Sequence, residues 1–285
     1  MTSKPSRTLS AAILCALAAI LLTPVARAAT VQDFDNPGTP YTAVGTATVV
    51  GGGPTGSFLR LTPSVDNQNG RVAFDLGDAG APAVGIEGQF DFRAIPGADS
   101  GGDGQADGIG FMVLPTSIHG TTGDYAVIGN PELARAAGAF GISLNIHQAG
   151  DPEPEISNNS IILSFNGATV AEVAAPFDIS TDQFHRANFS IDFQQGGGAN
   201  VSVSLIQDSL GIPQTEQAVY TDFNIPGFDP FEYRIGVQAR TGGQNADQQI
   251  DNINVVTSVP EPSSFVLAGL GLLGVVGIWR KTRRR

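Results

Sequence analysis

Apolar and polar residues alternate along much of this chain with a repeat of two, which is typical of β-strands. Within 86–93, the even-numbered positions, which include Phe90 and Phe92, face one side. Charged or amide side chains occupy the odd-numbered positions. Residues 188–193 alternate in the same way, and the alternation resumes at 201–205 after a run of three glycines. We therefore predict a β-hairpin over 188–205.

A second hairpin is predicted where Asn166-Gly167 separates two further alternating segments, because Asn-Gly is the strongest short hairpin signal. The first strand, 31–34, and the last, 250–255, are expected side by side, since chain ends often meet at a domain surface. One stretch, 131–137, is helix-like. The other predicted strands are 109–114, 141–146, 233–239 and 249–256. So many short strands predict an all-β domain over 29–256, a two-sheet antiparallel jelly-roll sandwich.

The first 28 residues have the order of a secretory signal peptide. Lys4 and Arg7 precede an apolar run, and Ala26-Arg27-Ala28 offers small residues at a cleavage site. We expect signal peptidase to cut after Ala28. Cys15 is the single cysteine of the chain and lies inside this segment, so the mature protein has no thiol. Disulfides, cysteine-ligated zinc and a cysteine nucleophile are thereby excluded.

The mature domain is strongly acidic. The whole chain has 15 basic and 27 acidic residues; three basic residues belong to the signal, and five basic and one acidic residue follow position 258. Residues 29–258 therefore keep 26 acidic residues against 7 arginines, a net charge of −19. Such a surface repels phosphate backbones and argues against nucleic acid as a partner. It suits an extracellular protein with a neutral ligand or a divalent cation.

The C-terminal segment, 259–285, has the order of a sorting address. The motif Val259-Pro260-Glu261-Pro262 is followed by an apolar run, 265–279, and a basic end. As a helix this run would reach only about 22 Å, short of a bilayer core of about 30 Å. The basic end would stay on the cytoplasmic side, which places the rest of the chain outside. An ordinary tail anchor is the alternative.

The motif, its spacing and its terminal position closely resemble the PEP-CTERM signal of exported bacterial proteins. That resemblance implies processing by an exosortase near Pro260–Pro262 and only transient attachment to the inner membrane. It places the mature protein at the cell surface, or in the extracellular matrix, of a Gram-negative-type bacterium.

A second resemblance begins at Ala106-Asp107-Gly108-Ile109-Gly110-Phe111, which is similar to the Ala-Asp-Gly-Ile-Ala-Phe strand entry of legume-type (L-type) lectins. A long loop, a strand over 139–146, the turn Asp151-Pro152 and a strand from Ser160 follow in the family's order. The resemblance is good over 85–167 and looser over 29–256. It implies a concanavalin A-like fold.

In these lectins the Asp of the motif accepts hydrogen bonds from sugar hydroxyls, and Asp107 holds that position. The family also uses a loop glycine N–H, which here would be Gly120 or Gly123. The loops 115–138 and 148–159 would form the walls, with Tyr125 as a candidate ring for stacking on the sugar. The implied ligand is a neutral polysaccharide or surface glycan.

The metal site of the family is only partly present. Its metal strand reads acidic-x-Asp, whereas this chain has Ser143-Leu144-Asn145, and of the usual acidic ligands only Asp151 remains. A transition-metal site is predicted to be lost. A Ca²⁺ site built from Asn145, Asp151 and backbone carbonyls, with Asp107 as a further candidate ligand, remains one alternative, because Ca²⁺ accepts neutral oxygen ligands. The absence of any metal is the other alternative. Asn145 is also a candidate sugar ligand.

Three functions remain after the sequence is considered. The favoured one is an exported carbohydrate-binding protein of the cell surface or the exopolysaccharide (biofilm) matrix. The alternative is a non-catalytic structural matrix protein whose lectin site has decayed, with Asp107-Gly108 as an ordinary turn. A glycoside hydrolase comes third, since the hydrolase pattern Glu-x-Asp-x-x-Glu is absent. We predict that the protein is not an enzyme.

Overall fold

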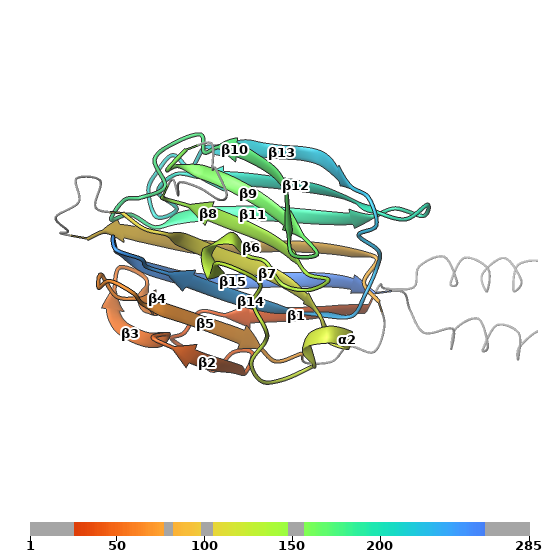
Figure 1. The fold of residues 1–285 in the computed structure, drawn as a ribbon, viewed down its shortest axis with the longest axis horizontal. Helices are drawn as coiled ribbons and strands as arrows, with labels where there is room; N and C mark the ends of the chain where they lie inside the picture. The colour runs from red at the N-terminus through yellow and green to blue at the C-terminus, as the bar shows by residue number, and fades with distance from the viewer. Residues whose placement is uncertain (1–25, 77–81, 98–104, 148–156, 260–285) are drawn as a thin grey trace, which may run out of the picture. The chain divides into compact units, whose positions relative to one another are not determined.

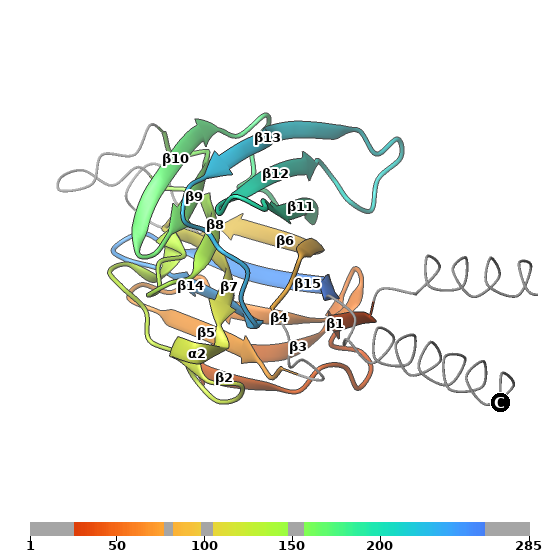
Figure 2. The same cartoon turned by 90° about the vertical axis from the view of Figure 1, so that its right-hand side faces the viewer.

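Two antiparallel β-sheets face each other in a computed structural model that describes residues 26–76, 82–97, 105–147 and 157–259 (Figure 1). Figure 2 shows the two layers separately. The sheet that contains residues 108–115, called sheet B, lies to the left of the sheet that contains residues 85–96, called sheet A. The predicted all-β sandwich is confirmed.

Sheet A has eight strands and sheet B has seven. Sheet A runs in the order β13 (Glu216–Ile225), β12 (Ala199–Ile206), β11 (His185–Phe193), β6 (Gly85–Pro96), β15 (Ala246–Val259), β4 (Gly56–Thr62), β3 (Thr48–Gly53), with β1 (Ala26–Gln32) paired to β15. Sheet B runs in the order β10 (Ala168–Ala174), β9 (Ser160–Phe165), β8 (Phe140–Asn145), β7 (Gly108–Pro115), β14 (Tyr233–Arg240), β5 (Asn69–Phe74), β2 (Tyr41–Gly45).

The main hydrophobic core lies between the two sheets. The rings of Phe90 on β6 and Phe111 on β7 stack with their centroids 4.4 Å apart. Phe189 on β11 adds a tilted ring 5.3 Å from Phe111. All three side chains are buried and belong to one continuous cluster, which explains why the alternating strands place their aromatic residues on one face.

Residues 27–258 form one compact unit, which contains this core. The predicted cleavage point at Ala28 falls within β1. The rest of the signal peptide, and the sorting segment from Pro260 onward, lie outside the described residues. Within the part of the chain that the structure covers, no helix is long and apolar enough to cross a membrane.

The two predicted hairpins are confirmed as β11–β12 and β9–β10. The first and last strands are paired as expected, although β1 covers Ala26–Gln32, several residues earlier than 31–34. The helix-like stretch predicted over 131–137 is helical only in its first three residues. A single 3-10 turn, η1 (Pro131–Leu133), ends at Ala134 because that residue adopts a left-handed conformation with φ 50°. The described residues contain one further short helix, α2 (Thr116–His119).

The long loop 116–139 covers the outer face of sheet B with a second, smaller hydrophobic cluster. Two glycines let η1 approach the sheet. A Cβ on Gly110 would lie 3.0 Å from the carbonyl oxygen of Pro131, and a Cβ on Gly141 would lie 2.1 Å from that of Ala134. Strand β7 is consequently buried on both faces, and Glu132 of η1 is held near the beginning of β7.

Candidate functional site

Asp107 lies at the point where β7 begins, between the ends of two neighbouring strands. It follows a cis peptide bond from Ala106. Its N–H donates to the carbonyl oxygen of Arg240 at the end of β14 (2.8 Å), and its own carbonyl accepts from the N–H of Ile146 beyond β8 (3.2 Å). These bonds fix the backbone on both sides. The Asp107 residue is only 5% exposed.

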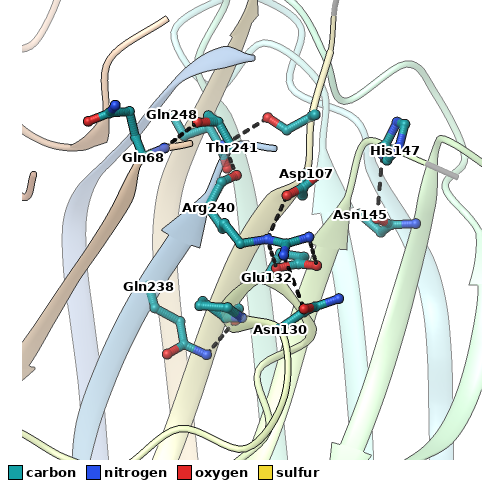
Figure 3. A network of polar contacts seen from close by, with 12 residues as sticks. Gln68, Asp107, Asn130, Glu132, Asn145, His147, Gln238, Arg240, Thr241 and Gln248 are labelled. Carbon is teal, nitrogen blue, oxygen red and sulfur yellow. Dashed lines mark hydrogen bonds and ion pairs between the residues drawn. The ribbon is translucent and has the colours of Figure 1, made fainter. Parts of the chain in front are cut away.

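Arg240 places its guanidinium against the Asp107 carboxylate (Figure 3). Its Nε lies 2.7 Å from Asp107 Oδ2 and 3.1 Å from Glu132 Oε2. Its Nη2 donates to Glu132 Oε1 and its Nη1 to Asn130 Oδ1, each at 3.1 Å. All three guanidinium nitrogens therefore contact oxygens from the start of β7 or from the loop that carries η1.

Glu132 and Asn130 reach this point because η1 is held against sheet B. The carbonyl of Pro131 accepts a hydrogen bond from the side-chain amide of Gln238 on β14. Glu132 is 3% exposed, an uncommon degree of burial for a carboxylate unless it is paired. Arg240 supplies the pairing charge, so this arginine connects the loop to the strand end.

The electrostatics of the site are dominated by burial. Burial raises the pKa of Asp107 above the usual range of an aspartate, and the charges of Arg240 and His147 oppose that shift without reversing it. Two buried carboxylates share the single guanidinium of Arg240.

A turn of two glycines leaves room beside the carboxylate. A Cβ on Gly242 would lie 3.5 Å from both carboxylate oxygens of Asp107, whereas a Cβ on Gly243 would meet nothing within 4 Å. The side-chain amide of Gln248 fastens the backbone beneath them by donating to the carbonyls of Arg240 (2.7 Å) and Ala106 (3.0 Å). The turn is therefore close to the carboxylate at Gly242 and uncrowded at Gly243.

Asn145 and His147 lie next to this cluster, at the end of β8 (Figure 3). The Asn145 Nδ2 faces the carbonyl oxygen of Ser157 (3.2 Å), which can only accept, so the amide nitrogen must point there. The Asn145 oxygen accepts from the backbone N–H of His147 (3.4 Å). Asn145 is 1% exposed and acts as a brace between strands in this structure.

Other predicted site residues lie elsewhere. The carbonyl of Gly123 accepts from Arg234 (2.6 Å), which pairs with Leu114 at the far end of β7. Five residues of β14 lie between Arg234 and Arg240, which places them about 20 Å apart along an extended strand. The N–H of Gly120 is used to close α2, bonding to Thr116. The structure therefore does not bring either glycine to Asp107.

Tyr125 is not a stacking ring, and this prediction is corrected. It is 5% exposed and packs in the second hydrophobic cluster under the loop. Its hydroxyl donates to the Val237 carbonyl (3.3 Å) and the Gln238 side chain (3.2 Å). Burial also raises its pKa well above the usual range. Asp151, the other predicted metal ligand, lies outside the described residues.

Sequence reasoning missed Arg240, Glu132 and Asn130. Arg240 follows directly after the predicted strand 233–239, and its position beyond an apolar strand end is a weak signal for a site residue. Glu132 and Asn130 carry no such signal, because they lie more than 100 positions from Arg240 and meet it only through the fold.

Comparison with known proteins gives matches for the C-terminal segment and for the β-sandwich. Residues 258–284 match the PEP-CTERM protein-sorting motif. No curated protein matches the chain. Among solved structures, lectin II from Ulex europaeus is similar with a TM-score of 0.56 at 13% identity, covering 82% of this chain and 99% of the lectin. Peanut lectin gives a TM-score of 0.54 at 17% identity, covering 84% and 100%.

The Ca²⁺-bound exoplasmic/lumenal domain of VIP36 is similar with a TM-score of 0.54 at 14% identity, covering 82% of this chain and 91% of that domain. Residues 27–258 thus have the fold of legume-type lectins. The chain combines this lectin-like fold with a C-terminal motif that implies export.

The described residues do not offer a calcium site of the kind that fold suggests. They contain no group of three or more His, Asp or Glu side chains able to hold a metal ion. Asn145 directs its amide nitrogen to Ser157 and its oxygen to a backbone N–H. The Asp107 carboxylate already has a cation against it, the guanidinium of Arg240. Ca²⁺ requires six to eight oxygens, so the fit is poor.

Proposed function

We propose that this protein binds glycan outside the cell, through the end of sheet B beside Asp107. The observation that carries the proposal is the buried Asp107 carboxylate, fixed by backbone bonds to β14 and to the segment after β8, with open space next to Gly243. A fixed carboxylate forms strong, charge-assisted hydrogen bonds with sugar hydroxyls. Arg240, 32% exposed, and Asn130 would supply further polar contacts.

A neutral glycan suits the charge of the site. An acidic sugar bound here would be placed beside two carboxylates, those of Asp107 and Glu132. The domain carries a large excess of acidic residues, which adds to the repulsion. The solved structures support the idea by analogy: VIP36 is described with a bound dimannoside, and its fold is the one seen here. The proposed ligand is a neutral polysaccharide of the cell surface or surrounding matrix, reached after exosortase processing.

One observation favours a second function. Asp107 is largely covered, and its carboxylate is already paired with Arg240. A structural matrix protein whose lectin site no longer binds sugar would show the same pairing. Catalysis of glycan hydrolysis is disfavoured, because Asp107 and Glu132 are held on one guanidinium, whereas a glycosidase places two carboxylates on either side of the scissile bond.

A glycan array separates the two functions. The domain of residues 27–258 would be compared with Asp107→Asn, which keeps the shape and removes the charge, and with Asp124→Asn as the matched control. Asp124 also pairs with an arginine, Arg71 (2.7 Å), whose backbone lies beside Gln238 of β14 and which takes no part in the Asp107 cluster. We expect saturable binding to a neutral glycan that Asp107→Asn loses and Asp124→Asn keeps. No binding to any glycan would leave the structural function.

A further inference from the structure

Four side-chain oxygens surround the Arg240 guanidinium. They are Asp107 Oδ2 at 2.7 Å and Glu132 Oε2, Glu132 Oε1 and Asn130 Oδ1 at 3.1 Å each. Asp107 and Glu132 are at most 5% exposed, whereas Asn130 lies at the surface. Carboxylate and amide oxygens are the ligands that hard divalent cations prefer. The arrangement therefore resembles a cation site whose centre is occupied by a side chain.

The backbone of Arg240 is fixed at the end of β14 by three contacts. The backbone carbonyl of Arg240 accepts from the Asp107 N–H (2.8 Å) and from the Gln248 side chain (2.7 Å). The same residue pairs with Gly108 in the β7–β14 ladder. Arginine is always protonated in proteins, and its planar fork matches carboxylate geometry. Arg240 thus provides a permanent positive charge that does not dissociate.

We propose that Arg240 takes the part of a divalent cation in this site. Its guanidinium joins Asp107 to the η1 loop and orders both, so that the site is preorganised in the absence of calcium. The inference deepens the proposed function, since a glycan held here would bind equally well in calcium and in chelator. Its structural half concerns the protein alone and can be tested without any glycan.

The test measures the melting temperature of the domain with excess EDTA and with millimolar Ca²⁺. For the wild type we expect the same melting temperature in both. Arg240→Met keeps an unbranched stem but removes the guanidinium charge that both Asp107 and Glu132 contact. Its melting temperature in EDTA should fall on the order of 10 °C. Ca²⁺ should restore part of that loss, because the vacated oxygens can then bind it.

Arg71→Met is the matched control, because it breaks a more exposed arginine–carboxylate pair, with Asp124, that does not involve Asp107 or Glu132. It should lose about 2 °C or less and show no response to Ca²⁺. Arg240→Lys serves if Arg240→Met does not fold. It keeps the charge without the fork, and should melt below the wild type with no Ca²⁺ response. Terbium luminescence gives a second measure of cation binding.

Two results would overturn the inference. One is a saturable rise of the wild-type melting temperature with Ca²⁺ that Asp107→Asn abolishes, since calcium would then bind at Asp107 despite Arg240. The other is an Arg240→Met, or failing that an Arg240→Lys, protein as stable as the wild type. Absence of glycan binding would refute the proposed function and leave these melting results unaffected.

Discussion

Asp107 and Arg240 are joined twice, once through the backbone and once through their side chains. The Asp107 N–H donates to the Arg240 carbonyl at 2.8 Å, and the Asp107 carboxylate lies 2.7 Å from the Arg240 Nε. The backbone bond holds the two residues side by side, and the Asp107 side chain is only 7% exposed, so water and salt screen this ion pair less than a surface pair. We expect this pair to be stronger than an ordinary surface salt bridge.

A double-mutant cycle of Asp107→Asn and Arg240→Met should show a coupling of about 1–3 kcal/mol in the free energy of unfolding. The lower bound reflects the partial exposure of Arg240, at 32%. Urea denaturation measures each free energy. The Arg71–Asp124 pair, with side chains 24% and 38% exposed, should give below about 1 kcal/mol in the same cycle. Additive losses at Asp107 and Arg240 would show that the contact contributes nothing.

Asp251 and His185 should give the stability of the domain opposite dependences on pH. Burial raises the pKa of Asp251 to about 6, with the charges of Asp91 and Asp35 adding to the shift. Between about pH 4 and 6 the folded state then binds the proton more tightly than the unfolded chain, so stability rises as the pH falls. Burial lowers the pKa of His185 to about 4. Between about pH 6.5 and 4 the unfolded chain binds that proton instead, and stability falls.

Each of these effects is worth roughly 3 kcal/mol, so they nearly cancel in the wild type. Asp251→Asn should expose the histidine effect, with unfolding free energy dropping by a few kcal/mol between pH 6.5 and 4. His185→Gln should show the opposite slope from pH 6 to 4. Denaturation at each pH measures both. Flat profiles in both variants would mean that neither group titrates in this window.

Gly141→Ala should displace η1 from sheet B. The added Cβ would lie 2.1 Å from the Ala134 carbonyl oxygen, a backbone atom that cannot rotate away. We expect a loss of about 2 kcal/mol or more in unfolding free energy, together with a more exposed Glu132. Gly196→Ala is the control, because a Cβ there would meet nothing within 4 Å. Equal stability of the two variants would contradict the close approach seen here.

Tyr125→Phe should affect stability and spare glycan binding. The hydroxyl donates to Val237 and Gln238 inside the loop cluster, so its removal should cost about 1 kcal/mol in thermal or urea unfolding. Because the ring is buried, affinity for an array-positive glycan should stay within twofold of the wild type. A loss of binding without a loss of stability would return Tyr125 to the site.

The sequence predicts the strands better than the site. Alternation in 86–93 and 188–205 is set by a core that lies on one face, so a period of two marks β6, β11 and β12 correctly. The sequence also predicts the position of Asp107, because its motif lies directly before the apolar residues of β7. Arg240, Glu132 and Asn130 could not be predicted, because only the docking of η1 through Gly110 and Gly141 brings them together.

The same reason explains the error at Tyr125. An aromatic residue in a long polar loop reads as exposed, but this loop folds back over sheet B and buries the ring against its outer face. Which face of a sheet a loop covers is a property of the tertiary fold. The helix-like stretch predicted over 131–137 is shorter in the structure for a similar reason, since η1 is shaped by its contacts with β7 and β8.

The most direct test of a glycan site beside Asp107 is amide NMR mapping of the domain, titrated in EDTA with neutral oligosaccharides from the array. We predict saturable shifts at Asp107, Asn130 and the Gly242–Gly243 turn, and none around Gly123. No saturable shift with any oligosaccharide, or shifts confined to another part of the sandwich, would contradict the proposed site.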